Sequence, residues 1–166
     1  AKAELDATRE LKKSLIRAAF SEGLERQRTG WQETKLGRLP ASWRIKRVKD
    51  VLVGKPTNGY SPQSNPDPPG TKTLNVSCIR NGECAVEKAT YVDVDNDVVT
   101  ALQVHRGDFF VLRGNGNRDF IGIGGVVRVD VSEPMIYSDL LFRLQFNGEE
   151  VVPMYLPYMW QTQAFL

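Results

Sequence analysis

The stretch HRGDFFVLRGNGNRDFIGIGGVV, residues 105–127, decides the fold because it predicts two strands separated by a polar loop. Residues 109–112 are a short apolar run of β-prone side chains, and residues 121–129 are the expected second strand. The loop between them offers Arg113, Asn115, Asn117 and Arg118, so it is expected to lie in solvent. Amide and guanidinium groups can form paired hydrogen bonds to adenine and guanine edges, which favours a nucleic-acid hypothesis. An ordinary Asn-Gly turn is the alternative.

The length and composition indicate one globular domain with an appendage. Of the 166 residues, 41% are hydrophobic and 25% charged, and no apolar run is long enough to cross a bilayer. The chain starts with Ala and ends within an expected helix, so we expect a fragment of a longer protein. Cys78 and Cys84 are too few for a disulfide framework or a zinc site, which predicts a cytoplasmic location and no metal.

Charge is distributed unevenly along the chain. Residues 1–50 carry thirteen Lys or Arg and seven Asp or Glu, a balance of +6, whereas residues 51–166 carry a balance of −4 within the total of +2. A basic segment beside a mildly acidic one suits an anionic partner, although a solvated lysine-rich helix has the same composition.

Residues 5–24 are the clearest helix. Their apolar stripe includes Leu11, Leu15, Ala18 and Ala19, and Gly23 is typical of a C-terminal cap. A polar spacer follows the helix. We therefore assign residues 1–29 to a projecting helical arm and residues 30–166 to the main domain. The stripe either joins the domain core or meets another helix.

A second basic region follows residue 43. Apolar residues at 45, 48 and 52 have helical spacing and predict a short helix. Its outer face would present four positive charges suited to phosphate contact, although a solvated face fits equally well. The candidate phosphate contacts, including one in a later hairpin turn, are Arg44, Lys46, Arg47, Lys49 and Arg80.

Residues 54–70 form a long loop that holds five of the nine prolines. Long loops in compact domains are often functional, and polar and aromatic side chains can bond to bases or stack on them. The candidate base-reading residues of this loop are Lys55, Thr57, Asn58 and Tyr60.

The rest of the chain predicts a strand-rich α+β domain with a helix at each end. Strands are expected over 73–77, 84–86, 90–94 and 140–146, with an Asn-Gly turn at 80–83. A short helix over 97–104 is expected to be capped by Asp97, and a last helix starts near Pro153. Alternation in 140–146 places Phe142 on one face of the strand and Arg143 on the other. The face with Phe142 is expected in the core and the face with Arg143 at least partly exposed to solvent.

Motifs for catalysis and cofactors fail on their context. Glycines at 122–125 are followed by strand residues instead of the helix that a dinucleotide fingerprint requires. Pro66-Asp67 followed by Glu83 or Glu87 could suggest a nuclease metal site, but neither glutamate is followed by the expected spaced lysine. No serine lies in a Gly-x-Ser-x-Gly motif. His105 is the single histidine and precedes a turn. We expect no catalytic residue and no cofactor.

Several local patterns resemble the specificity subunit of type I restriction-modification systems. LKKSLIRAAFSEGL, residues 11–24, resembles the end of the family's long helix. LPASW at 39–43 with VKDV at 48–51 resembles the entry to a target recognition domain. GKP at 54–56 and HRGDFFV at 105–111 resemble its glycine loop and its Gly-Asp strand. The order and spacing of these patterns extend the resemblance over essentially the whole chain.

The resemblance implies a non-catalytic subunit whose recognition domain reads half of a split target in double-stranded DNA. It implies methyltransferase (modification) subunits and a restriction subunit as partners, and packing of the long helix against a second one from the same subunit or another copy. Only one recognition domain and one helix are found in this sequence. The alternatives are a fragment of a fused restriction-methylation enzyme and a protein-interaction module that does not bind DNA.

Overall fold

The computed structural model describes residues 2–23, 30–62, 70–114, 116 and 118–160. The chain divides into two compact units, one made of residues 1–46 with 158–166 and the other of residues 47–157. Within the described ranges, no helix has the length and apolar character needed to cross a membrane.

The first unit contains the expected N-terminal helix, α1 (Lys2–Glu22). Gly23 ends it at a φ of +84°, and its N–H donates to the Ala19 carbonyl at 3.2 Å, so the predicted glycine cap is confirmed. No residue of α1 is buried. The helix contacts a hairpin that the sequence analysis missed, formed by β1 (Trp31–Thr34) and β2 (Gly37–Pro40).

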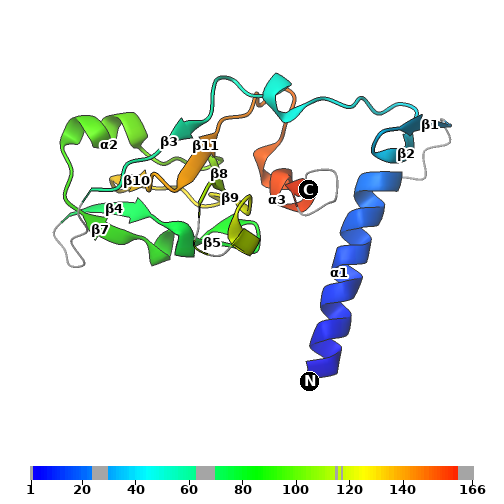
Figure 1. Ribbon diagram of the computed structural model, residues 1–166, viewed down its shortest axis with the longest axis horizontal. Helices are drawn as coiled ribbons and strands as arrows, with labels where there is room; N and C mark the ends of the chain where they lie inside the picture. Colours follow the sequence, from blue (N-terminus) through cyan, green and yellow to red (C-terminus); the bar gives the residue numbers. More distant parts are fainter. Residues whose placement is uncertain (1, 24–29, 63–69, 115, 117, 161–166) are drawn as a thin grey trace. The chain divides into compact units, whose positions relative to one another are not determined.

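The second unit contains a six-stranded sheet in the order β3-β11-β8-β9-β6-β5 (Figure 1). The central strand β8 was predicted at the correct residues, and its antiparallel pairing with β9 confirms the two strands flanking a loop. The strands are β3 (Thr57–Asn58), β5 (Ile79–Arg80), β6 (Glu83–Cys84), β8 (Phe109–Leu112), β9 (Gly124–Val126) and β11 (Leu141–Leu144).

A three-stranded sheet has the order β10-β4-β7. Its strands are β4 (Thr71–Leu74), β7 (Thr90–Val92) and β10 (Met135–Tyr137). β10 was not expected from the sequence, and it runs parallel to β4 although 60 residues of chain separate them. The core joins the two sheets: the Phe110 ring of β8 lies 4.8 Å from the Tyr137 ring of β10, and both are fully buried with Leu74 and Leu141.

Short helices complete the second unit. α2 (Asn96–Leu102) starts one residue earlier than expected, with Asp95 and not Asp97 at the N-cap position. The last helix is the 3-10 turn η5 (Pro153–Tyr155) followed by α3 (Leu156–Trp160). The other 3-10 turns are η1 (Val48–Asp50), η2 (Val76–Cys78), η3 (Val86–Lys88) and η4 (Arg118–Phe120). The α+β class is confirmed.

One predicted strand is shorter in the structure, and a glycine lets it approach its neighbour closely. The expected strand over 121–129 is reduced to β9, which pairs in parallel with β6. A Cβ on Gly125 would lie 2.8 Å from the Glu83 carbonyl oxygen, so glycine permits this close approach of the two backbones. The Arg80–Glu83 hairpin turn is confirmed, with Asn81 and Gly82 both at positive φ.

Candidate nucleic-acid interface

Phe142 lies at the centre of a partly exposed surface on the six-stranded sheet. In the strand register, Phe142 of β11 is opposite Asn58 of β3 on one side and Val111 of β8 on the other. Directly opposed residues of antiparallel strands project from the same face of a sheet. Phe142 and Val111 are half-buried, whereas Asn58 is exposed. This surface, called the Phe142 face below, therefore offers a ring and a neighbouring amide to solvent.

Arg113 reaches the same ring from the end of β8. Its guanidinium carbon lies 5.6 Å from the centre of the Phe142 ring, a cation–π distance, and its backbone N–H donates to the Leu140 carbonyl at 2.9 Å. The side chain is exposed. Two predicted base-reading residues from separate loops, Asn58 and Arg113, thus lie beside one aromatic ring.

The segment that carries Asn58 is fixed by contacts with β10 and the residues after it. A Cβ on Gly59 would overlap the Tyr137 carbonyl oxygen, and the Tyr60 N–H donates to that oxygen at 2.9 Å. Tyr60 keeps 48% of its surface exposed. The Thr57 hydroxyl hydrogen-bonds to the Tyr137 hydroxyl at 2.9 Å, on the face opposite to Asn58 because strand neighbours alternate. Thr57 is exposed as a residue, but its hydroxyl is already bonded to Tyr137, whereas Tyr60 is exposed and has its ring available.

Several cations of the second unit keep their charge available. Lys55, Arg113 and Arg118 are exposed and form no ion pair with any described residue. Arg118 lies in η4, in the loop that the sequence analysis selected. Asn115 and Asn117 of that loop lie outside the described residues.

The predicted helix over residues 45–52 is wrong. Only η1, three residues long, forms there, and Ile45 is 49% exposed. Backbone hydrogen bonds draw the next residues to β11 instead: the Val53 N–H donates to the Gln145 carbonyl at 2.9 Å, and Leu52 forms a bridge with Phe146. An apolar spacing of i, i+3 and i+7 cannot distinguish a helix from an irregular segment whose apolar residues meet a sheet.

The cations expected on that helix are consequently not arranged along one helical face. Arg44 and Lys46 belong to the first unit, whereas Arg47 and Lys49 belong to the second. Arg47 donates to both carboxylate oxygens of Asp50, at 2.7 and 2.9 Å. This pairing raises the pKa of Arg47 and lowers that of Asp50. Arg47 is therefore less suited to phosphate contact than Lys49, which is exposed.

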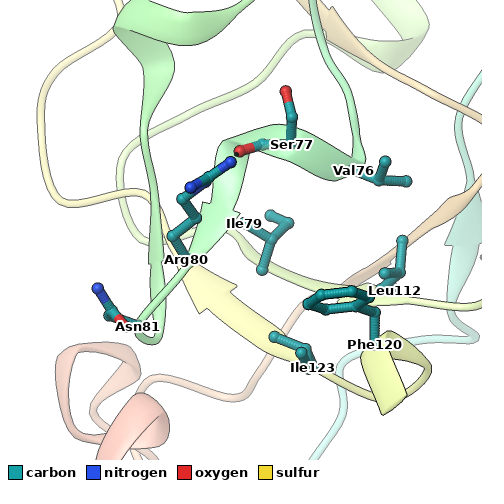
Figure 2. A pocket seen from close by; sticks show the side chains of 8 residues that line it. All are labelled: Val76, Ser77, Ile79, Arg80, Asn81, Leu112, Phe120 and Ile123. Atoms are coloured by element: carbon teal, nitrogen blue, oxygen red, sulfur yellow. Dashed lines mark hydrogen bonds between the residues drawn. The ribbon is translucent and has the colours of Figure 1, made fainter. Parts of the chain in front are cut away.

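Arg80 lies apart from the Phe142 face. It lines a cleft of about 460 Å³ together with Asn81 and Leu112 (Figure 2). Leu112 is opposite Leu141 in the strand register, so it projects from the other face of the sheet than Val111 and Phe142. Arg80 therefore lines a cleft that includes no residue of the Phe142 face.

Beneath the Phe142 face lies a buried ion pair that the sequence did not reveal. Arg143, expected on the wetter side of β11, is only 9% exposed, and its guanidinium is 3.6 Å from the Asp108 carboxylate. The same guanidinium donates to the Gln103 carbonyl at 2.8 Å. Burial raises the pKa of Asp108, although its bond from the His105 N–H and the charge of Arg143 oppose that shift. The ion pair ties β11 to the start of β8, on the side of the sheet opposite to Phe142.

The apolar stripe of α1 is open to solvent. Leu11 is 60% and Leu15 61% exposed, and Ala18 and Ala19 are half-buried. The described residues of the first unit do not cover the two leucines, and residues 24–29 of the spacer lie outside the description.

Comparison with known proteins gives one consistent result. The chain is 22% identical to the type I restriction enzyme EcoKI specificity subunit of Escherichia coli K12, over 77% of this chain and 29% of that protein. It is also 22% identical to the type I restriction enzyme MjaVIII specificity subunit of Methanocaldococcus jannaschii, over 98% of this chain and 38% of that protein. The resemblance to type I specificity subunits is confirmed. No family model matches the chain.

A solved structure supports the fold of this specificity-subunit-like chain. It is described as the structural basis underlying complex assembly and conformational transition of the type I R-M system. Superposition gives a TM-score of 0.51 with 17% identity, covering 95% of this chain and 35% of the solved one. The chain thus spans about a third of the length of the specificity subunits that it matches.

Phe142 was missed by the sequence analysis as a site residue. Its place in an alternating strand predicted a core position, and both faces carry large apolar side chains. The sequence offered one indirect signal: Asp108, directly before β8, can supply the carboxylate that a buried arginine such as Arg143 requires, and burial of Arg143 leaves Phe142 on the more exposed face.

Proposed function

We propose that this chain recognises duplex DNA as the recognition part of a type I specificity subunit, without catalysis or a cofactor of its own. The observation that carries the proposal is the position of Asn58 and Arg113 on either side of Phe142. Asn and Arg are the side chains that read adenine and guanine in the major groove through paired hydrogen bonds. The similarity to specificity subunits supports the same function.

The charge of the second unit favours local contact over general attraction to DNA. Residues 47–157 carry eleven Lys or Arg and fourteen Asp or Glu, a balance of −3. Five basic residues there are already paired with carboxylates: Arg47, Lys72, Arg106, Arg128 and Arg143. We propose that Lys55, Tyr60 and Arg118 contact the duplex next to Asn58 and Arg113, and that Lys49 contacts phosphate.

The decisive experiment compares Arg113→Ala with Arg47→Ala in competition binding. The probes are a duplex carrying the methylated motif mapped in the host and a scrambled duplex. Arg113→Ala should cost roughly 1 to 3 kcal/mol on the motif alone and relax the choice at one base position. Arg47→Ala should change neither affinity much, because Asp50 already holds its charge. Equal losses on both duplexes for Arg113→Ala would reduce its role to phosphate contact.

A salt titration separates phosphate contact from base reading. Replacing Lys55 by Ala should weaken binding on both duplexes if it contacts phosphate, and should lower the slope of log affinity against log salt by about 0.9. Absence of any duplex binding at low salt would leave the protein-interaction module as the better hypothesis.

A variant of Phe142 tests whether the ring positions the guanidinium. Phe142→Leu keeps an apolar residue in β11 but removes the cation–π contact, which contributes about 0.5 to 1 kcal/mol at an exposed site. Binding to the motif should therefore weaken roughly two- to fivefold, and combining the variant with Arg113→Ala should give no further loss. Additive losses would show that Phe142 and Arg113 act independently.

The proposed partners follow the same assignment. Methyltransferase (modification) subunits and a restriction subunit would assemble with the protein in the cytoplasm, directed by it to a split target. The stripe of α1 would pack against a second long helix from the same subunit or another copy, because Leu11 and Leu15 are large apolar residues left exposed.

A further inference from the structure

The cleft lined by Arg80, Asn81 and Leu112 has apolar walls and one cationic residue at its edge. The walls are formed by Val76, Ile79, Leu112, Phe120 and Ile123. Arg80 lies to one side of them with its guanidinium directed toward Ser77 (Figure 2). Its volume of about 460 Å³ is within the range of pockets that enclose a ligand group, about 300 to 1,000 Å³.

The walls of the cleft are fixed before any ligand arrives. Ile79 is 7% exposed and Leu112 3%, so both belong to the core. The hairpin that carries Arg80 closes with Asn81 and Gly82 at φ values of +54° and +83°, a tight Asn-Gly turn. A preformed cleft costs little conformational entropy on binding, so its apolar surface contributes efficiently to affinity.

DNA recognition on the Phe142 face does not use this cleft. Leu112 projects from the opposite side of the sheet to Val111 and Phe142, as the register shows. The walls are also mainly aliphatic, with Phe120 as their one aromatic member, whereas a nucleobase site usually offers rings for stacking and polar groups for its edges. The chemistry of the cleft therefore fits an apolar side chain better than a base.

The surroundings of the cleft specify the charge of its ligand. Phe120, which lines the cleft, is 48% exposed, and an exposed apolar side chain at a pocket is typical of protein interfaces. Arg80 uses its Nε to bond the Ser77 carbonyl at 3.1 Å and forms no ion pair with a described residue. A guanidinium group at the rim of an apolar cleft complements a carboxylate that flanks an apolar side chain.

We propose that this cleft docks an acidic segment of a protein partner, which inserts one apolar side chain between Phe120, Ile79 and Leu112 and pairs its carboxylates with Arg80. The choice of partner rests on the proposed function: it is the modification subunit of the restriction-modification system. Docking on the face opposite to Phe142 lets one recognition domain hold its duplex and its partner at the same time.

The test measures the affinity of the full chain for the purified modification subunit, with duplex affinity measured in parallel. Phe120→Ala removes a side chain typical of interface hot spots, and Arg80→Glu reverses the rim charge. Each should weaken docking at least tenfold and leave duplex affinity within twofold. Ile121→Ala is the matched control, since Ile121 is equally exposed but does not line the cleft, and it should change neither. Circular dichroism should show that all three variants are folded. A fourth variant, Phe120→Leu, keeps an apolar side chain and should retain most of the docking affinity.

The outcomes separate this inference from the proposed function. Docking by Phe120→Ala and Arg80→Glu at the wild-type level, or no docking by the wild type, overturns the inference. Loss of duplex binding with docking intact also overturns it and makes the cleft a nucleic-acid site. If the wild type docks the modification subunit but binds no duplex, and both variants lose docking, the cleft assignment is supported. Only the proposed DNA recognition is then rejected.

Discussion

Replacing Arg143 by Met should destabilise the second unit strongly at neutral pH. The guanidinium lies 3.6 Å from the Asp108 carboxylate, and each side chain is only 10% exposed. It also donates to the Gln103 carbonyl at 2.8 Å and sits 5.1 Å from the centre of the Tyr137 ring. Met preserves much of the volume but leaves a buried carboxylate without its charge partner. Removing one member of a buried pair costs about 3 to 5 kcal/mol.

The loss should depend on pH because Asp108 can escape the penalty by binding a proton. Burial already raises the pKa of Asp108 in the folded state. A raised pKa means that the contribution of this group to stability is fully present below the unfolded pKa of about 3.9 and declines as pH rises through the folded pKa. Without Arg143 the folded pKa should rise further. The Arg143→Met variant should therefore lose less stability at pH 4.5 than at pH 7.5.

Urea denaturation followed by circular dichroism measures this effect. With a slope of about 1 to 3 kcal/mol per molar urea, a loss of 3 kcal/mol lowers the midpoint by about 1 to 3 M. Adding Asp108→Asn to Arg143→Met removes the buried charge and should recover part of the loss at pH 7.5. A loss under about 1 kcal/mol at pH 7.5, or equal losses at both pH values, would falsify the view that this pair balances two buried charges.

Two further predictions concern close packing and the exposed helix. Gly59→Ala should lower the unfolding free energy by about 1 to 3 kcal/mol in thermal denaturation, since its Cβ would overlap the Tyr137 carbonyl oxygen, whereas Gly54→Ala meets no atom within 4 Å and should be tolerated. Leu11→Asp with Leu15→Asp should abolish helix-mediated association in sedimentation experiments without lowering the melting temperature; a cooperative drop in that temperature would place α1 in a core.

Local sequence signals were sufficient to predict elements whose conformation depends only on residues close together in the chain. Gly23 ends α1 because a left-handed φ closes the last turn, and Asn81 with Gly82 forms a tight hairpin turn for a similar backbone reason. The apolar run of β8 was found at its correct residues because both of its faces are largely buried, which produces a continuous apolar stretch. The resemblance to specificity subunits also rested on such short local patterns.

The sequence by itself thus determined the α+β class, α1 and its glycine cap, β8, and the exposure of Arg113 and Arg118 in the loop after β8. Only the tertiary structure decided that Asn58 and Arg113 meet at Phe142, that Arg143 points inward, and that residues 45–52 form no helix. The physical reason is that strand pairing between distant segments sets which residues are opposed and which face is covered. Alternation with a period of two defines two faces, but the partners of Arg143 determine which of them is buried.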